Sequence, residues 1–349
     1  MATIFGYTLT TNGLNFSADK RWIKVVNVSF LCYSMALMIS TTISIVIEMT
    51  NGVSYAQIDD LIWQLFAFYM YSILWKNRKE IIDFRSSLER LSINIDKKRL
   101  LYTEIVYNVY HWSTFLLYLI CWIILADKLK FTRRSFLIVK TGSPILTTIE
   151  NTFYDIAYYL NDRLAPLLTL YYLLILENIY MVKIDFIDSI EQLIVCSNDQ
   201  RFEWREIVKL TDRFEQLFNF APFLKFGQTF VQTVIYLIFS LENNKMATIV
   251  YYAIAHYVFD ACLTLYLILL ISKWNQRLKL KISTLIDQSM STRCPNKLKL
   301  IGDIEKQAPF NLTAHGMFSL DKSVILGFCS NLVTFTVLII QLFGFDRKN

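Results

Sequence analysis

The chain has 349 residues, of which 54% are hydrophobic and 18% charged, and its mean hydropathy is +0.38. This composition lies outside the range of ordinary soluble domains and makes a membrane protein the first hypothesis. The formal net charge of +6 comes mainly from basic residues between apolar segments, so it is no evidence for nucleic-acid binding.

Seven segments along the chain are candidate membrane spans, because a helix needs about 20 residues to cross a hydrocarbon core of roughly 30 Å. Four are long and apolar: residues 25–47, 105–126, 247–271 and 323–345. Three are shorter and span only if charged neighbours reach the interface: residues 58–75, 154–177 and 226–241. We therefore predict an all-α polytopic membrane protein, in which residues 1–349 form a single seven-helix domain.

The distribution of Lys and Arg predicts the orientation of these helices. With the N-terminus in the cytosol, 26 of the 35 basic residues fall in cytosolic segments. The C-terminus is then extracellular, which inverts the topology of a G-protein-coupled receptor. The two glycosylation motifs, at Asn15 and Asn311, would both be cytosolic, and we expect neither to carry a glycan.

Two cytosolic segments, residues 203–216 and 273–287, mix apolar and charged residues at helical spacing. This pattern favours helical extensions that project below the membrane. The alternative is that they are amphipathic linkers lying on the anionic inner leaflet.

The last predicted helix carries a stripe of small and polar residues at steps of three and four. Its members are Ser323, Gly327, Ser330, Thr334, Leu338, Gln341 and Phe345. A glutamine exposed to lipid would cost several kcal/mol, so the stripe must face protein or water. Two interpretations remain, a helix-packing seam or a pore wall, and the stripe alone favours the seam.

Residues 309–342 also contain a recognisable pattern. Gly316, Phe318, Leu320 and Asp321 precede the last helix, which carries Thr334 and Gln341 at fixed spacing. The pattern resembles the C-terminal signature of insect gustatory receptors, a family related to insect odorant receptors. Two positions depart from it, because Phe335 replaces a tyrosine and Leu342 replaces a phenylalanine.

The resemblance implies a ligand-gated, non-selective cation channel, built as a homo- or heterotetramer with related receptors. By carry-over, the last helix lines the pore, with Thr334, Leu338, Gln341 and Leu342 as pore or gate residues, and the cytosolic extensions form an anchor region. The implied partners are a small-molecule tastant, monovalent and divalent cations, and lipid of the plasma membrane of gustatory neurons. Thr336 stands where sugar-sensing members carry glutamate, so we expect a non-sugar stimulus such as a bitter compound.

Aromatic and polar residues gather at the predicted extracellular ends of the helices and form the candidate ligand pocket. They are Trp63, Trp122, Tyr154, Asp155, Tyr158, Tyr251 and His256. The alternative for each is a place in the aromatic belt that borders a membrane.

An enzyme is not expected, because the three histidines lack metal-ligand spacing and the sequence has no phosphate loop, dinucleotide fingerprint or nucleophile elbow. We expect no cofactor and no metal. The alternatives are a seven-helix receptor that signals through a soluble partner, an insect odorant receptor, a transporter, and a membrane enzyme using His256 and Asp260.

Overall fold

A computed structural model gives the arrangement of the chain. It describes residues 7–10, 13–16, 55–91, 144–193, 198–242, 247–289 and 295–345, with single helical positions between 32 and 39 and between 102 and 116. The helices are α2 (Tyr55–Lys76), α3 (Arg78–Leu91), α5 (Pro144–Gln192), α6 (Asn198–Phe218), α7 (Phe220–Glu242), α8 (Ala247–Ser289), α9 (Pro295–Gln307) and α10 (Lys322–Phe345). The strands are β1 (Tyr7–Thr10), β2 (Gly13–Phe16), β3 (Thr313–Ala314) and β4 (Phe318–Ser319).

The described residues are predominantly helical, which confirms the predicted helical architecture. Two short antiparallel hairpins, β1–β2 and β3–β4, were not predicted, so the expectation of an all-α chain is wrong in these places. The turn between β3 and β4 contains Gly316 with a φ of 72°, a conformation that glycine adopts readily.

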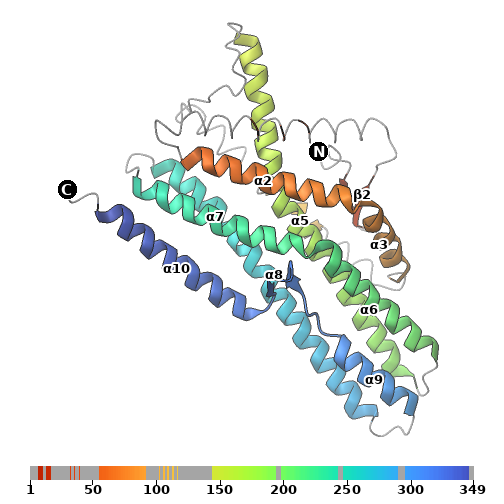
Figure 1. Cartoon of the computed structure of the whole chain (residues 1–349). Coiled ribbons are helices and arrows are strands. Elements are labelled where there is room, and N and C mark those ends of the chain that lie inside the picture. The colour runs from red at the N-terminus through yellow and green to blue at the C-terminus, as the bar shows by residue number, and fades with distance from the viewer. Residues whose placement is uncertain are drawn as a thin grey trace.

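Four helical segments form a basal bundle, which consists of α6, α9 and the C-terminal halves of α5 and α8 (Figure 1). Helices α5 and α8 run through 49 and 43 residues without interruption, so at about 1.5 Å per residue each is longer than about 60 Å. Both descend into the bundle, while α6 and α9 return from its tip. Both α5 and α9 begin at a proline, whose missing N–H costs nothing at the first helical position.

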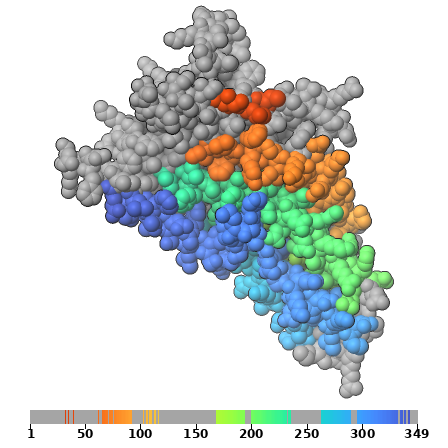
Figure 2. Space-filling model, viewed as in Figure 1, coloured from red at the N-terminus to blue at the C-terminus, as the bar shows by residue number. Residues whose placement is uncertain are grey.

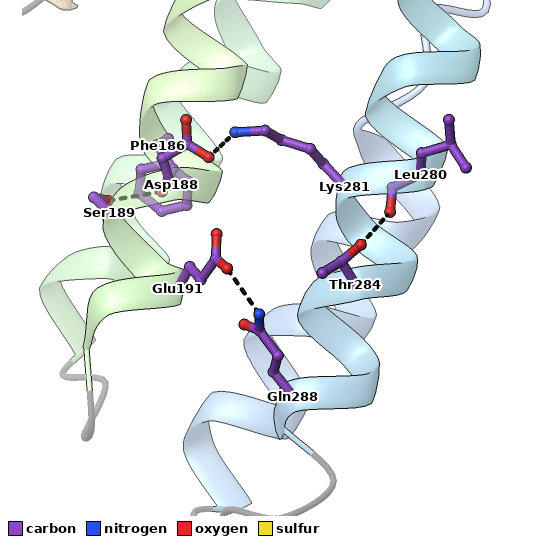
Figure 3. Close-up of polar contacts among 8 residues, drawn as sticks. All are labelled: Phe186, Asp188, Ser189, Glu191, Leu280, Lys281, Thr284 and Gln288. Carbon is purple, nitrogen blue, oxygen red and sulfur yellow. Dashed lines mark hydrogen bonds and ion pairs between the residues drawn. The ribbon is translucent and has the colours of Figure 1, made fainter.

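Aromatic pairs and polar contacts join the helices of the basal bundle. Tyr180 of α5 stacks on Trp274 of α8 with centroids 5.1 Å apart. Lower down, Lys281 pairs with Asp188, and Gln288 donates to Glu191 over 2.9 Å (Figure 3). The helices predicted over 203–216 and 273–287 are therefore present, with their apolar faces buried in this bundle.

The boundary between α6 and α7 lies at Asn219. Pro222 lacks the N–H that would bond the carbonyl group of Phe218, and its ring clashes with that carbonyl in a continuous helix. The helix therefore breaks, and α7 leaves the basal bundle to pack beside α10 (Figure 1). Near the end of α6, Phe214 and Phe218 contact Phe84 of α3.

The helices α2, α5, α7, α8 and α10 contain the predicted ranges 58–75, 154–177, 226–241, 247–271 and 323–345. The ranges 25–47 and 105–126 lie outside the described residues apart from single helical positions. Within the described parts of the chain, no helix has a stretch that is both long and apolar enough to cross a membrane.

Candidate functional site

The first turn of α10 is fixed by the side chain of Asp321, the last residue of the predicted approach motif. One carboxylate oxygen accepts from the backbone N–H of Ser323 over 2.8 Å and also contacts the Ser323 hydroxyl. The other accepts from the Ser319 hydroxyl over 2.7 Å. These hydrogen bonds, above all those from Ser323, hold the pKa of the Asp321 carboxyl below its ordinary value. Asp321 is therefore the N-cap of α10.

The other motif residues build the β3–β4 hairpin just before this cap. His315 and Gly316 both have positive φ, at 53° and 72°, and the Gly316 N–H donates to the Thr313 hydroxyl. A Cβ atom at Gly316 would meet nothing within 4 Å, so the backbone conformation alone favours glycine there. Phe318 packs its ring edge-on against Phe226 of α7, with centroids 5.5 Å apart.

The stripe on α10 does not pack against the described parts of its own chain. Ser323, Gly327, Ser330, Thr334, Leu338 and Gln341 are all exposed, and Leu338 retains 46% of its surface. Figure 2 shows α10, in dark blue, at the margin of the molecule. Asn331 is also exposed, and it lies between the stripe and the side that contacts α7, since it is four residues after Gly327 and three after Phe328. This second amide was not predicted as part of the stripe.

Aromatic pairs hold α10 to α7 on another side. Phe328 contacts Phe226 and Phe230, and Phe335 packs its ring edge-on against Phe230 with centroids 5.1 Å apart. Phe335, one of the two departures from the family pattern, thus contacts a helix of its own chain. Thr334 bonds back to the carbonyl of Ser330 over 2.9 Å. The side chain of Leu342, the other departure, lies outside the described residues.

Two polar residues of the basal bundle, Lys183 and Asn275, form a second feature of the site, which was not predicted from the sequence. Lys183 of α5 is fully buried and donates to the carbonyl oxygen of Ala308 over 3.0 Å. Its burial lowers its pKa to about 7, against the opposing effect of the negative charge of Asp212. Asn275 of α8 binds both backbone groups of Phe310. Both partners lie in the connection between α9 and α10.

A signal for Lys183 exists in the sequence. It follows Ile179 by four residues and precedes Ile187 and Ile190 by four and seven, so it lies on the apolar stripe of α5. The sequence gives a similar signal for Asn275, which follows the buried Ile271 by four residues and precedes the buried Leu278 by three, although its neighbours Lys273, Gln276 and Arg277 resemble an exposed face.

The ligand-pocket candidates are placed only by their helices. Trp63 lies in α2, Tyr154, Asp155 and Tyr158 lie in the first half of α5, and Tyr251 and His256 lie in the first third of α8. Their side chains are outside the described set, and Trp122 lies outside the described residues altogether. The pocket therefore stays a prediction.

Comparisons with known proteins provide the context for this geometry. No family model and no curated protein matches the sequence. Among solved structures, the chain is similar to the olfactory receptor OR5 of the insect Machilis hrabei, with a TM-score of 0.67 and 10% identity over 93% of this chain and 90% of that one. The chain has the fold of an insect olfactory receptor.

The same receptor in complex with eugenol gives a TM-score of 0.67 and 11% identity, covering 93% of this chain and 91% of that one. The similarity extends over nearly the whole of both proteins, so it includes the basal bundle as well as the helices above it. Identities of 10% and 11% show a shared fold and leave the ligand and the activity as separate questions.

Proposed function

We propose that this chain is a chemosensory receptor of the insect gustatory and odorant type, and that it acts as a ligand-gated, non-selective cation channel. The observation that carries this proposal is its fold, which matches an insect olfactory receptor over 93% of the chain. The seven apolar segments and the charge bias of the sequence support a plasma-membrane protein with its N-terminus in the cytosol.

In this proposal α10 lines a pore around which several subunits assemble. Its polar stripe is exposed in the single chain and includes Thr334, Leu338 and Gln341. An exposed carboxamide on an otherwise apolar helix needs water or a partner chain, because lipid offers it no hydrogen bond. A ring of neutral glutamines from several subunits has no fixed charge, so it would discriminate weakly among monovalent cations.

The stimulus we propose is a small non-sugar molecule. A gustatory role is supported by the residues of the C-terminal signature, and an odorant role is supported by the olfactory receptors among the solved structures. A panel of bitter compounds, sugars and volatiles including eugenol separates these roles when applied to cells that express the chain. We expect whole-cell current with a non-sugar compound while G-protein signalling is blocked.

The pore assignment is tested at Gln341. We expect Gln341→Glu to change divalent permeation or block, since it adds a ring of negative charge, and Gln341→Ala to alter conductance or gating at near-normal surface expression. The control is Gln276→Glu, which makes the same chemical change at an exposed position of α8. If both Gln341 variants conduct like the parent, the glutamine belongs to a packing seam.

A further inference from the structure

The connection between α9 and α10, residues 308–321, is here called the strap. It crosses the top of the basal bundle and includes the β3–β4 hairpin (Figure 1). Side chains of α5, α6 and α8 all form hydrogen bonds with it. A surface loop between two helices would be expected to bond mainly to water, so this strap is unusually well fixed.

The contact from α8 recognises the strap backbone. The Asn275 side-chain oxygen accepts from the Phe310 N–H over 2.7 Å, and its amide nitrogen donates to the Phe310 carbonyl oxygen over 3.0 Å. One side chain thus satisfies both polar groups of one buried residue. A side-chain amide presents a donor and an acceptor side by side in this way.

The contact from α5 lies two residues away along the strap. Lys183 donates to the Ala308 carbonyl oxygen, and its ammonium group lies 4.1 Å from the centroid of the Phe310 ring. The carbonyl oxygen and the ring both favour a positively charged donor in a buried place. Lys183 and Asn275 therefore hold successive parts of the same short segment from two different helices.

Further hydrogen bonds fix the part of the strap between Phe310 and α10. Glu215 of α6 accepts from both the backbone N–H and the hydroxyl of Thr313, over 3.1 and 2.7 Å. The Leu320 N–H then donates to the Leu312 carbonyl oxygen over 2.8 Å, and the next residue is the Asp321 cap of α10.

The same two helices reach the candidate ligand region at their other ends. Tyr158 lies 25 residues before Lys183 on α5, and His256 lies 19 residues before Asn275 on α8. At 1.5 Å per residue these separations are roughly 38 and 29 Å along unbroken helices. Both helices continue through these ranges, although in α5 Pro166 lacks the N–H that would bond the carbonyl group of Asp162. A shift or rotation at the upper end of α8, which contains no proline, is therefore transmitted most directly to the strap.

We propose that the strap couples α5 and α8 to the base of α10, and that Asn275 and Lys183 are the positioning residues of this coupling. The inference rests on the proposed function in one respect, because α10 must be the pore helix for the coupling to serve gating. The coupling of α5 and α8 to the base of α10 through the strap does not itself depend on what α10 does.

Hydrogen–deuterium exchange of the purified full chain tests the proposal. Asn275→Asp keeps the acceptor for the Phe310 N–H and replaces the donor with a second acceptor. Lys183→Met removes the donor to Ala308 while roughly preserving side-chain length. Thr313→Val is a milder variant within the strap itself. Gln276→Glu and Lys279→Met are the controls, because they make matched changes at exposed positions of α8.

We expect exchange to rise about tenfold in the strap and in the first two turns of α10 for the three test variants, since each loses a hydrogen bond that is buried or partly buried. The controls should exchange like the parent, and α6 and α9 should stay protected throughout. Unchanged exchange in the first turns of α10, or an equal rise over the whole bundle, would overturn the coupling. Failure of the channel proposal shows separately, as the absence of ligand-evoked current in the parent chain.

Discussion

Lys183 shows how one residue can combine a structural role with a dependence on pH. Its amine is fully buried and donates to the carbonyl oxygen of Ala308. The carboxylate of Asp212 on α6 favours the charged form, but burial has the larger effect and lowers the pKa to about 7. In the unfolded chain a lysine has a pKa of about 10.4.

This difference predicts how stability changes with pH. Between about pH 7 and pH 10 the unfolded chain binds a proton at Lys183 that the folded chain has released, so the free energy of unfolding rises with pH. Below about pH 7 the folded chain holds the charge, and the cost of burying it is fully present. We expect Lys183→Met to flatten this rise, measured as the thermal unfolding midpoint of the purified protein from about pH 7 to pH 10.

The matched control for this measurement is Lys279→Met, which removes an exposed lysine from α8. A parent protein whose midpoint does not rise over this range would contradict a lowered pKa at Lys183. A rise that persists unchanged in Lys183→Met would assign the effect to another group.

Single residues differ in how well the sequence predicts them. The positions of Asp321 and Gly316 before the last helix were predicted by the family pattern, and the structure supplies their physical roles as an N-cap and a turn glycine. Lys183 and Asn275 were missed because their partners are backbone groups of the strap, 125 and 35 residues away. Backbone partners leave no trace in side-chain patterns.

At the scale of elements, the β3–β4 hairpin sets the path of the chain into α10. The His315 N–H donates to the Asn219 carbonyl oxygen over 3.0 Å, at the break between α6 and α7. The hairpin turn therefore sits against the point where α6 ends, and its tight reversal depends on positive φ at two successive residues.

Two glycines in this region have opposite predicted effects on stability. A Cβ atom added at either one would meet nothing within 4 Å, but Gly316 has a positive φ while Gly302 lies inside α9. Gly316→Ala should lower the free energy of unfolding by about 1 kcal/mol, and Gly302→Ala should raise it by about 0.5–1 kcal/mol. Denaturant titration of the two variants beside the parent measures both values, and equal signs would contradict the stated backbone cause.

Element types were more predictable than element contacts. Apolar runs and amphipathic periods located α2, α6, α7, α8 and α10, because these helices bury faces that the sequence displays. The two hairpins were not predicted, since strands of two to four residues are too short to show a clear alternation of apolar and polar residues. The sequence prediction separated the helical segments 203–216 and 226–241, and the structure places the break between them at Asn219, three residues before Pro222.

At the scale of the molecule, the long helices α5 and α8 connect its two ends, and the predicted topology gives those ends different surroundings. The basal bundle is predicted to lie in the cytosol and the other end to face the exterior. The fold relation to an insect olfactory receptor extends across both ends. The topology itself remains a prediction, which a chemical label can test.

Glycosylation supplies that label. In cells that glycosylate, we expect no glycan on Asn15 or Asn311 of the parent, because both are predicted to be cytosolic. Val139→Asn creates an Asn-Lys-Thr motif in the predicted extracellular segment between residues 126 and 154. It should add a mass that a glycosidase removes, whereas a glycan on Asn15 in the parent would refute the predicted orientation.

The distance along the chain between strap contacts also has a consequence for biosynthesis. Lys183 and Ala308 are 125 residues apart, so α10 acquires its fixed base only after α6, α8 and α9 have been made and packed. In a nascent chain whose basal bundle has not assembled, the strap before α10 lacks the contacts that fix it. In the proposed assembly, folding of the basal bundle therefore precedes any contact of α10 with other subunits.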